Sequence, residues 1–241
     1  MNIGIIGSGG REHAICSFIK NSKKVDKIYC IPGNAGTDEI ATNVDIEIKD
    51  YNKIKNLVID KKIDLLIVGP EQPLVDGIVD FFENLNIRIF GPNKSAAQLE
   101  GSKIFTKKIC QQYNISTANF GIFQNENDAR KFLEKSNYPI VIKADGLAAG
   151  KGVYICEKKE DALDAVKEIL DGKFGKATNL LIEEFLTGEE MSYFLISDGK
   201  SIKAFDTAQD HKRVLEGDKG KNTGGMGAYS PSNLINNELE E

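Results

Sequence analysis

Over the first hundred residues, short apolar runs alternate with segments whose apolar residues recur at helical spacing. Residues 3–6 form the first run, and the glycine-rich turn at residues 7–10 ends it. This order predicts a strand, a glycine turn and a helix. The residues that repeat with helical spacing are Ala14, Ile15, Phe18 and Ile19.

The same alternation continues beyond the first helix. Apolar runs at residues 28–31 and 64–68 and an alternating segment at residues 44–48 predict further strands. Helices are expected around residues 54–58 and from the low seventies to about residue 85, before a last strand near Ile89. Strands that alternate with helices favour a parallel sheet with helices on both faces. We expect this first domain to span residues 1–101.

Ligands of open parallel sheets bind beyond the carboxyl ends of the strands. The turns at residues 7–12, 33–37 and 69–77 are therefore predicted to converge on one site. The first turn matches the dinucleotide pattern G-x-G-x-x but has Glu12 where the third glycine belongs, which is weak support for NAD. A phosphate held by the N–H groups of the helix start and by Arg11 fits better, and an ordinary strand-to-helix turn is the alternative.

The pattern changes after residue 101. A linker helix is expected within residues 102–118, followed by a module at residues 119–187 and a further segment at residues 188–241. The module contains a strand, a helix, a hairpin, a helix and a strand, which indicates an antiparallel sheet. Its predicted elements are a strand at 120–123, a helix at 128–135 capped near Asn127, a helix at 162–170 and a strand at 179–186, with a hairpin at 191–205 in the next segment.

The hairpin of this module, at residues 141–155, joins two β-branched runs by a loop of small residues. Glycine and alanine allow backbone N–H groups to approach an anion, and Lys143 and Lys151 add positive charge. The loop is not a P-loop, because it is one residue short, lacks Ser or Thr after the lysine and precedes a strand. A kinase is excluded by the missing catalytic-loop motifs. A phosphate-covering flap and a plain surface hairpin remain.

The amino-acid composition limits the kinds of molecule that we expect the protein to bind. The 241 residues carry 31 basic and 36 acidic side chains, so the net charge is −5 and no basic stripe predicts a nucleic-acid partner. The four cysteines form no C-x-x-C pair, which argues against zinc or redox motifs and for reduced, mostly packed thiols in the cytoplasm. Neither an export signal nor a membrane span is expected.

Six strings, taken together and in order, resemble one known family. They are GSGGREH at 7–13, PGNAGT at 32–37, GPEQPL at 69–74, KADGLAAGKG at 143–152, QDHKR at 209–213 and NTGGMGAY at 222–229. The chain is similar to the phosphoribosylamine–glycine ligase family of purine biosynthesis, in the ATP-grasp superfamily. The resemblance covers the whole chain and implies an N-terminal α/β domain followed by an incomplete α+β ATP-grasp domain.

The resemblance implies a role for particular residues. Adenine would lie against Glu183, Glu184, Phe185 and Leu186, its ribose against Glu190, and the phosphates against Lys103, Lys143, Lys151, Arg213 and Asn222. The phosphoribosyl substrate would lie near Gly9, Gly10, Arg11, Glu12, Asn34, Ala35, Gly36, Thr37 and Glu71, and Asp210 would receive an amino group. Lys143, Arg213 and Asp210 would be the catalytic residues. Lys143 suits its role better than Lys151, and His211 is a better site candidate than His13.

The implied reaction joins glycine to 5-phosphoribosylamine through glycyl phosphate, using ATP and Mg²⁺ or Mn²⁺. The family has its metal ligands in a later part of its catalytic domain, beyond Glu241. The intact protein is expected to be a monomer, and this chain alone is expected to bind nucleotide weakly without turnover. Another ATP-grasp ligase for a different carboxylate and a non-catalytic nucleotide-binding fragment are the alternatives.

Overall fold

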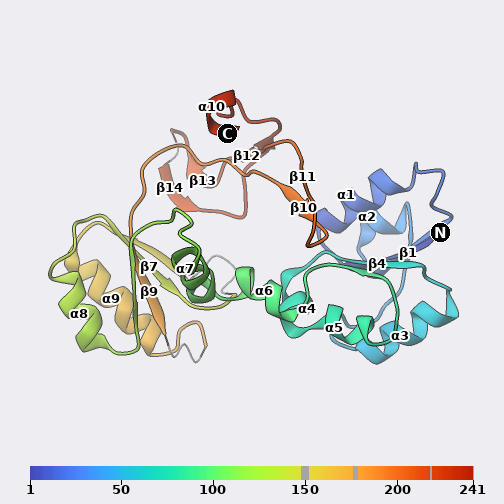
Figure 1. The fold of residues 1–241 in the computed structure, drawn as a ribbon, viewed down its shortest axis with the longest axis horizontal. Helices are drawn as coiled ribbons and strands as arrows, with labels where there is room; N and C mark the ends of the chain where they lie inside the picture. The colour runs from blue at the N-terminus through green and yellow to red at the C-terminus, as the bar shows by residue number, and fades with distance from the viewer. Residues whose placement is uncertain (148–151, 176–178, 218, 241) are drawn as a thin grey trace. The chain divides into compact units, whose positions relative to one another are not determined.

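The computed structural model describes residues 1–147, 152–175, 179–217 and 219–240 (Figure 1). The chain divides into two compact units, Met1–Glu184 and Phe185–Glu241. The first unit contains a five-stranded sheet and a four-stranded sheet, and the second unit contains three two-stranded sheets.

The five-stranded sheet is parallel throughout, with strand order β3-β2-β1-β4-β5, as the alternating pattern predicts. Its strands are β1 (Asn2–Gly7), β2 (Lys27–Pro32), β3 (Thr42–Asn43), β4 (Leu65–Val68) and β5 (Ile89–Phe90). The helices in this part of the chain are α1 (Gly10–Ile19), α2 (Ala35–Asp38), α3 (Tyr51–Asp60), α4 (Glu71–Asp76), α5 (Ile78–Glu83) and α6 (Lys94–Gly101).

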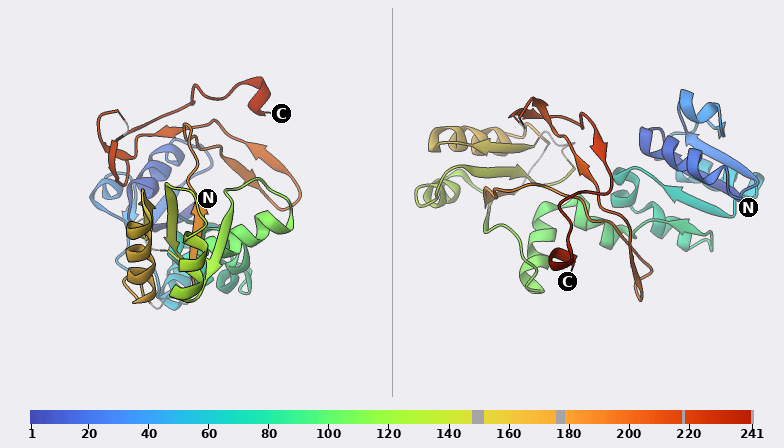
Figure 2. Two further views of the ribbon diagram at one scale, coloured as in Figure 1. Left: turned by 90° about the vertical axis from the view of Figure 1, so that its left-hand side faces the viewer. Right: turned by 90° about the horizontal axis from the view of Figure 1, so that it is seen from above.

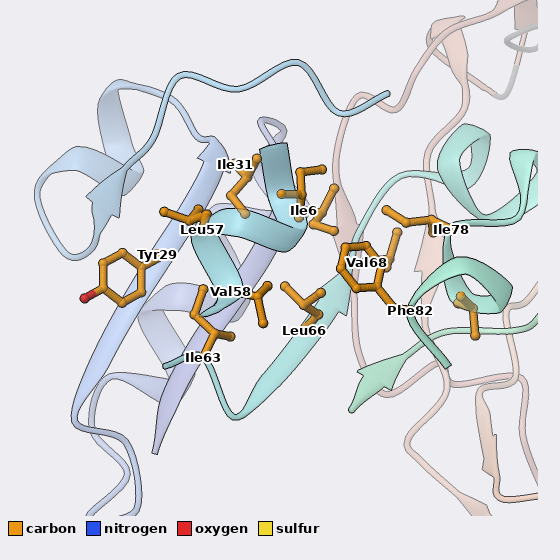
Figure 3. Packing of buried hydrophobic residues seen from close by; sticks show 12 residues of the cluster. Ile6, Tyr29, Ile31, Leu57, Val58, Ile63, Leu66, Val68, Ile78 and Phe82 are labelled. Atoms are coloured by element: carbon orange, nitrogen blue, oxygen red, sulfur yellow. The ribbon is translucent and has the colours of Figure 1, made fainter. Parts of the chain in front are cut away.

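Side chains of the parallel sheet alternate between two apolar clusters, one on each face. Ile6 and Leu66 pack with residues of α3 and α5, and Figure 3 shows this cluster from close by. Ile5 and Cys30 point to the other face, where Cys16 of α1 meets them. Figure 1 shows α1 and α3 on opposite sides of the sheet. Helices on both faces leave the carboxyl ends of the strands as the place where the loops gather.

One sequence-based prediction in this region is wrong. Residues 44–48 are not a strand, although Val44, Ile46 and Ile48 pack against the core as their alternation suggests. Their backbone lacks the pairing of a strand, since strand β3 ends at Asn43 and the N–H of Ile46 donates back to the carbonyl of Val44. The predicted first helix is present as α1, where Phe18 is 84% exposed and Cys16 is the buried apolar residue.

The region after β4 differs from its prediction in two further details. The helix expected to reach residue 85 is divided into α4 and α5 at Gly77, which has a φ of +95°. This left-handed conformation suits glycine and ends a helix. Helix α6 was not predicted. It starts at Lys94 and is capped by Asn93, whose side chain accepts a hydrogen bond from the N–H of Ala96.

The four-stranded sheet is antiparallel, with strand order β6-β9-β7-β8, as predicted for this module. Helices α8 and α9 pack on one face through an apolar cluster that includes Ile142, Val166 and Ile182. Figure 2 shows α9 running alongside the strands. The elements are α7 (Lys103–Gln112), β6 (Phe120–Phe123), α8 (Glu126–Leu133), β7 (Ile140–Ala144), β8 (Val153–Cys156), α9 (Lys159–Leu170) and β9 (Leu180–Glu184).

The predicted hairpin is confirmed as β7 paired with β8, but residues 148–151 of its loop, including Lys151, lie outside the described residues. The N-cap of α8 is Asn125 rather than Asn127. Asn125 can accept a hydrogen bond from the N–H of Asp128, whereas Asn127 is already inside the helix.

The second unit is built from short strands. The predicted hairpin at residues 191–205 is confirmed as β10 (Leu195–Ser197) paired with β11 (Ile202–Ala204). The other elements are β12 (Gln209–Asp210), β13 (Arg213–Leu215), β14 (Lys219–Asn222), β15 (Ala228–Tyr229) and α10 (Asn237–Glu240). Within the described ranges, every helix is too short or too polar to cross a bilayer.

Candidate functional site

Three turns meet at the carboxyl ends of β1, β2 and β4, and we call residues 7–12, 33–37 and 69–77 the glycine-loop end. The side-chain amide of Asn34 donates to the carbonyl of Ser8 at 2.8 Å. Arg11 donates to the carbonyl of Gly69 at 2.6 Å and forms an ion pair with Glu71 at 2.9 Å. The predicted convergence of these turns is therefore confirmed.

Glu12 lies beneath the first turn instead of projecting from it. The residue is 4% exposed, and its carboxylate accepts a hydrogen bond from the N–H of Gly9 at 2.5 Å. A Cβ atom at Gly69 would lie 1.9 Å from the nearer Glu12 oxygen, and one at Gly7 would lie 2.8 Å from the other. Both glycines leave room for this carboxylate. Because the N–H of Gly9 already donates to Glu12, the N–H groups left for the predicted anion contact are the next ones, at Gly10 and Arg11.

The second turn is fixed by hydrogen bonds between polar side chains. Asn34 caps α2 by accepting from the N–H of Thr37 at 3.0 Å, and the fully buried Thr37 hydroxyl donates to Asn43 at 2.7 Å. Asn43 was not predicted as part of this region, because it stands in strand β3 and outside the quoted motifs. The imidazole of His13 lies beside Gly36, where a Cβ would be 3.0 Å from its Cδ2 atom. His13 thus packs against Gly36 in the first turn of α2.

A second cluster lies on the face of the antiparallel sheet opposite α8 and α9. In β7 and β9 alternate residues belong to the apolar cluster, so Lys143 and Glu183 point to the other face. The carboxylate of Glu183 forms ion pairs with Lys143 and, at 2.8 Å, with Lys107 of α7. We call Lys103, Lys107, Lys143 and Glu183 the lysine face.

Lys103 stands at the start of α7 and donates to the carbonyl of Gly146 at 2.8 Å. Burial lowers the pKa of its ammonium; the carboxylate of Asp145 opposes this shift and the charge of Lys143 adds to it. Asp145 accepts hydrogen bonds from the Ser102 hydroxyl at 3.0 Å and from the N–H of Ile104 at 3.2 Å. It therefore ties the residues after β7 to the first turn of α7. Sequence reasoning missed Asp145, although it belongs to the string at 143–152.

Glu184 ends strand β9. Its carboxylate accepts hydrogen bonds from the backbone N–H and the side-chain amide of Asn119, at 2.9 and 3.1 Å. These bonds lower the pKa of the Glu184 carboxyl. The side chains of both Glu183 and Glu184 thus have protein partners, so their predicted contact with adenine would come from the backbone.

The second unit brings several predicted residues together. Lys212 forms an ion pair with Glu190 and lies 3.8 Å from a carboxylate oxygen of Asp210. Arg213 donates to the carbonyl of Gly220 at 2.7 Å and is opposite Asn222 in the β13–β14 pair. Lys212 was not predicted, although it lies within the string at 209–213. The remaining predicted or considered positions of this unit are Phe185, the 65%-exposed Leu186, and His211, whose ring centroid is 6.0 Å from that of Tyr229.

The described residues contain no group of three or more His, Cys, Asp or Glu side chains able to hold a metal ion. Cys16, Cys30 and Cys156 are buried free thiols, as expected for packed cysteines. Cys16 and Cys30, however, are adjacent in space, with 3.1 Å between their sulfur atoms. Burial raises the pKa of Cys30 to about 12. The distance between these cysteines along the chain concealed this contact.

Comparison with solved structures defines the class of fold. A crystal structure of phosphoribosylamine–glycine ligase from Thermotoga maritima matches 98% of this chain and 56% of its own with a TM-score of 0.80 and 34% identity. N5-carboxyaminoimidazole ribonucleotide synthetase from Thermus thermophilus matches with a TM-score of 0.64 at 18% identity, over 86% of this chain and 54% of its own. A parallel-sheet domain followed by an ATP-grasp domain is the shared architecture.

Comparison with family models then identifies the protein family. Residues 1–100 match the N domain of phosphoribosylglycinamide synthetase, and residues 101–241 match its ATP-grasp (A) domain. The chain belongs to the phosphoribosylglycinamide synthetase family. Curated phosphoribosylamine–glycine ligases from Mesorhizobium japonicum and Haemophilus influenzae are each 49% identical over 100% and 99% of this chain. The chain spans about 57% of the length of these relatives.

Proposed function

We propose that the protein containing this chain ligates glycine to 5-phosphoribosylamine, forming glycinamide ribonucleotide, ADP and phosphate. The observation that carries the proposal is the pair of family matches, which together account for every residue from 1 to 241. Curated relatives with the name phosphoribosylamine–glycine ligase support it at 49% identity. The reaction would proceed through glycyl phosphate, as part of purine biosynthesis in the cytoplasm, with the intact protein acting as a monomer.

In this proposal the glycine-loop end holds the phosphoribosyl group. The N–H groups of Gly10 and Arg11 open helix α1, where the helix dipole favours an anion. Arg11 is fixed by Gly69 and Glu71 and keeps a planar set of donors suited to phosphate. The buried Glu12 shapes the turn. The neighbouring residues Gly9, Asn34, Ala35, Gly36, Thr37 and Glu71 would complete this substrate site.

ATP with Mg²⁺ or Mn²⁺ would bind in the ATP-grasp part of the chain, and the metal supplies charge neutralisation on the phosphates. Lys103 and Lys143 both present ammonium groups on the lysine face, which suits phosphate oxygens. Phosphoryl transfer needs alignment and neutralisation of charge more than a strong base. The other proposed nucleotide contacts are Lys151, backbone groups of Glu183 and Glu184, and Phe185, Leu186, Glu190, Arg213 and Asn222, with Asp210 receiving an amino group.

A coupled assay on the full-length protein tests the function. We expect ADP release that requires both glycine and 5-phosphoribosylamine, the latter generated in the assay. ADP release with another amino or carboxylic acid in place of glycine would favour a different ATP-grasp ligase. No substrate-dependent ADP release from folded, metal-supplied protein would contradict the proposal.

A further inference from the structure

Glu183 is a buried carboxylate between two ammonium groups. Its side chain is 6% exposed, and its two oxygens form ion pairs with Lys107 on one side and Lys143 on the other. A buried carboxylate without cations would cost several kcal/mol, and the two ammonium groups offset this cost. The carboxylate consequently points into the lysine face and is not available to a ligand.

Lys107 is surrounded by protein groups. Its ammonium donates hydrogen bonds to the Thr117 hydroxyl at 2.7 Å and to the carbonyl of Ala118 at 3.1 Å. It also lies 2.8 Å from a carboxylate oxygen of Glu183, with which it forms an ion pair. The same nitrogen lies 5.3 Å from the centroid of the Phe120 ring, which adds a cation–π contact. Lys107 is therefore a fixed charge inside the protein.

Lys143 differs from Lys107 in both exposure and partners. Its side chain is 27% exposed against 10% for Lys107. Across the described part of the chain, Glu183 is its one ion-pair partner, which leaves N–H donors for a ligand. Two ammonium groups and one carboxylate give this trio a net charge of +1. If Lys107 were absent, Glu183 would neutralise Lys143 and weaken its attraction for an anion.

We propose that Glu183 and Lys107 are positioning residues for Lys143: the carboxylate of Glu183 orients the Lys143 ammonium, and Lys107 compensates the charge of that carboxylate, so that Lys143 presents a full positive charge to a nucleotide phosphate. This inference rests on the proposed function. It assigns Glu183 a task different from lining the adenine with its side chain.

Equilibrium binding of MgATP to the intact protein and four variants tests the inference. Glu183→Gln keeps the shape of the side chain but removes its charge, and Lys143→Met removes the ammonium. We expect Lys143→Met to weaken binding on the order of tenfold to a hundredfold and Glu183→Gln by about tenfold, as for charge-assisted hydrogen bonds. The double variant Glu183→Gln/Lys143→Met should bind like Lys143→Met alone, because Glu183 acts through Lys143. Additive losses would overturn the inference.

The fourth variant separates positioning from stability. Replacing the buried pair by Lys107→Met/Glu183→Leu should leave the protein folded, because removing both charges together leaves no uncompensated charge between them, although the Thr117 hydroxyl and the Ala118 carbonyl lose the Lys107 donor. MgATP binding should nevertheless stay about tenfold weaker than in the wild type, as it does in Glu183→Gln. Wild-type affinity in this folded variant would overturn the inference. Glu134→Gln, which removes an exposed ion pair with Lys159 between α8 and α9, is the control and should bind as the wild type does.

A readout without nucleotide keeps the two proposals distinguishable. Competitive acylation with acetic anhydride, read by mass spectrometry, should label Lys143 faster in Glu183→Gln than in the wild type, with Lys159 as the internal reference. Unchanged labelling would overturn the positioning of Lys143. Intact, folded wild-type protein that binds no MgATP would contradict the proposed function and this inference together, whereas equal binding by wild type and Glu183→Gln would contradict the inference alone.

Discussion

The glycine-loop end and the lysine face use different groups to provide positive charge for an anion. At the glycine-loop end the positive groups are backbone N–H donors at the start of α1 and a single arginine, which an exposed carboxylate accompanies. On the lysine face they are side-chain ammonium groups on neighbouring elements, with a carboxylate buried between two of them. The first arrangement depends on where strands end, and the second depends on which way side chains point.

This difference determines what each region tolerates. An added atom should destabilise the turns of the glycine-loop end, because the Glu12 carboxylate occupies the space next to Gly7 and Gly69. Removal of a charge should disturb the lysine face, because each charge there interacts with its charged neighbours. We therefore expect added volume to be the more damaging change at the glycine-loop end, and loss of charge to be the more damaging change on the lysine face.

The largest effect is expected from removing the Lys143 charge in the intact enzyme. If this donor contributes about 3 kcal/mol to the transition state, Lys143→Met should slow turnover on the order of a hundredfold. Steady-state kinetics with varied ATP measure this change. Binding of ribose 5-phosphate, a stable probe for the glycine-loop end, should be unaffected. A parallel loss of ribose 5-phosphate binding would show that the two regions are not independent.

A smaller effect is expected from adding one methyl group at Gly69. Gly69→Ala places a Cβ within 1.9 Å of Glu12, so the carboxylate must leave its position under Gly9. We expect a loss of about 1–3 kcal/mol in the free energy of unfolding, measured by urea denaturation.

Two controls make the Gly69 test specific. Gly10→Ala, where a Cβ would meet nothing within 4 Å, should leave stability nearly unchanged. In the Glu12→Ala background, Gly69→Ala should cost much less than in the wild type, because the conflicting carboxylate is gone. An equal cost in both backgrounds would show that Glu12 is not the reason for glycine at this position.

Arg11 should matter for ligand binding but little for folding. Its ion pair with Glu71 joins two exposed side chains, so Arg11→Met should change the free energy of unfolding by at most about 1 kcal/mol. Binding of ribose 5-phosphate should weaken by about tenfold, the usual value of a charge-assisted contact. Calorimetric titration measures this loss. Unchanged affinity would place the phosphate elsewhere.

The smallest expected effect is a pH dependence at Lys103. Its pKa is lowered, so in the free protein its ammonium loses the proton at a lower pH than an ordinary lysine does. Affinity for MgATP should therefore begin to fall as the pH rises through this lowered pKa. Lys103→Arg, which stays charged, should not show this decline between neutral pH and about 10. Identical pH profiles would show that Lys103 does not contact the phosphates.

The same lowered pKa has a consequence for stability. Burial disfavours the charged form of Lys103 in the folded state, so the cost is present while both states are protonated. Between the lowered pKa and the ordinary value of 10.5, the unfolded chain binds more protons than the folded one. Stability attributable to Lys103 therefore rises with pH in that window. Lys103→Met should not show this rise.

Much of the glycine-loop end was predictable from sequence. Glycine turns after apolar runs mark strand ends, and the strand ends of a parallel sheet lie at one edge. That reasoning places Asn34 near Ser8 and Arg11 near Gly69, as the structure shows. It could not find Asn43, because the sequence of a two-residue strand does not indicate that one of its side chains accepts a hydrogen bond from Thr37.

The lysine face was predictable only in part. Lys103 and Lys143 were found through motif resemblance. Lys107 and Asp145 were missed because their roles come from the packing of α7 against the antiparallel sheet, between residues 41 or more positions apart. Cys16 and Cys30 make the same point, since only the packing of α1 on β2 brings them together.

The alternation of side chains along β9 couples the packing of the apolar cluster to the placement of the ion pairs. Leu180 and Ile182 face the apolar cluster, and Glu183 faces the ion pairs. Deleting one residue here would turn Glu183 toward the helices and an isoleucine or leucine toward the ammonium groups. Point substitutions in β9 can alter core or charge separately, but insertions and deletions must change both. Natural length variation should therefore avoid this strand and accumulate in the turns on either side of it.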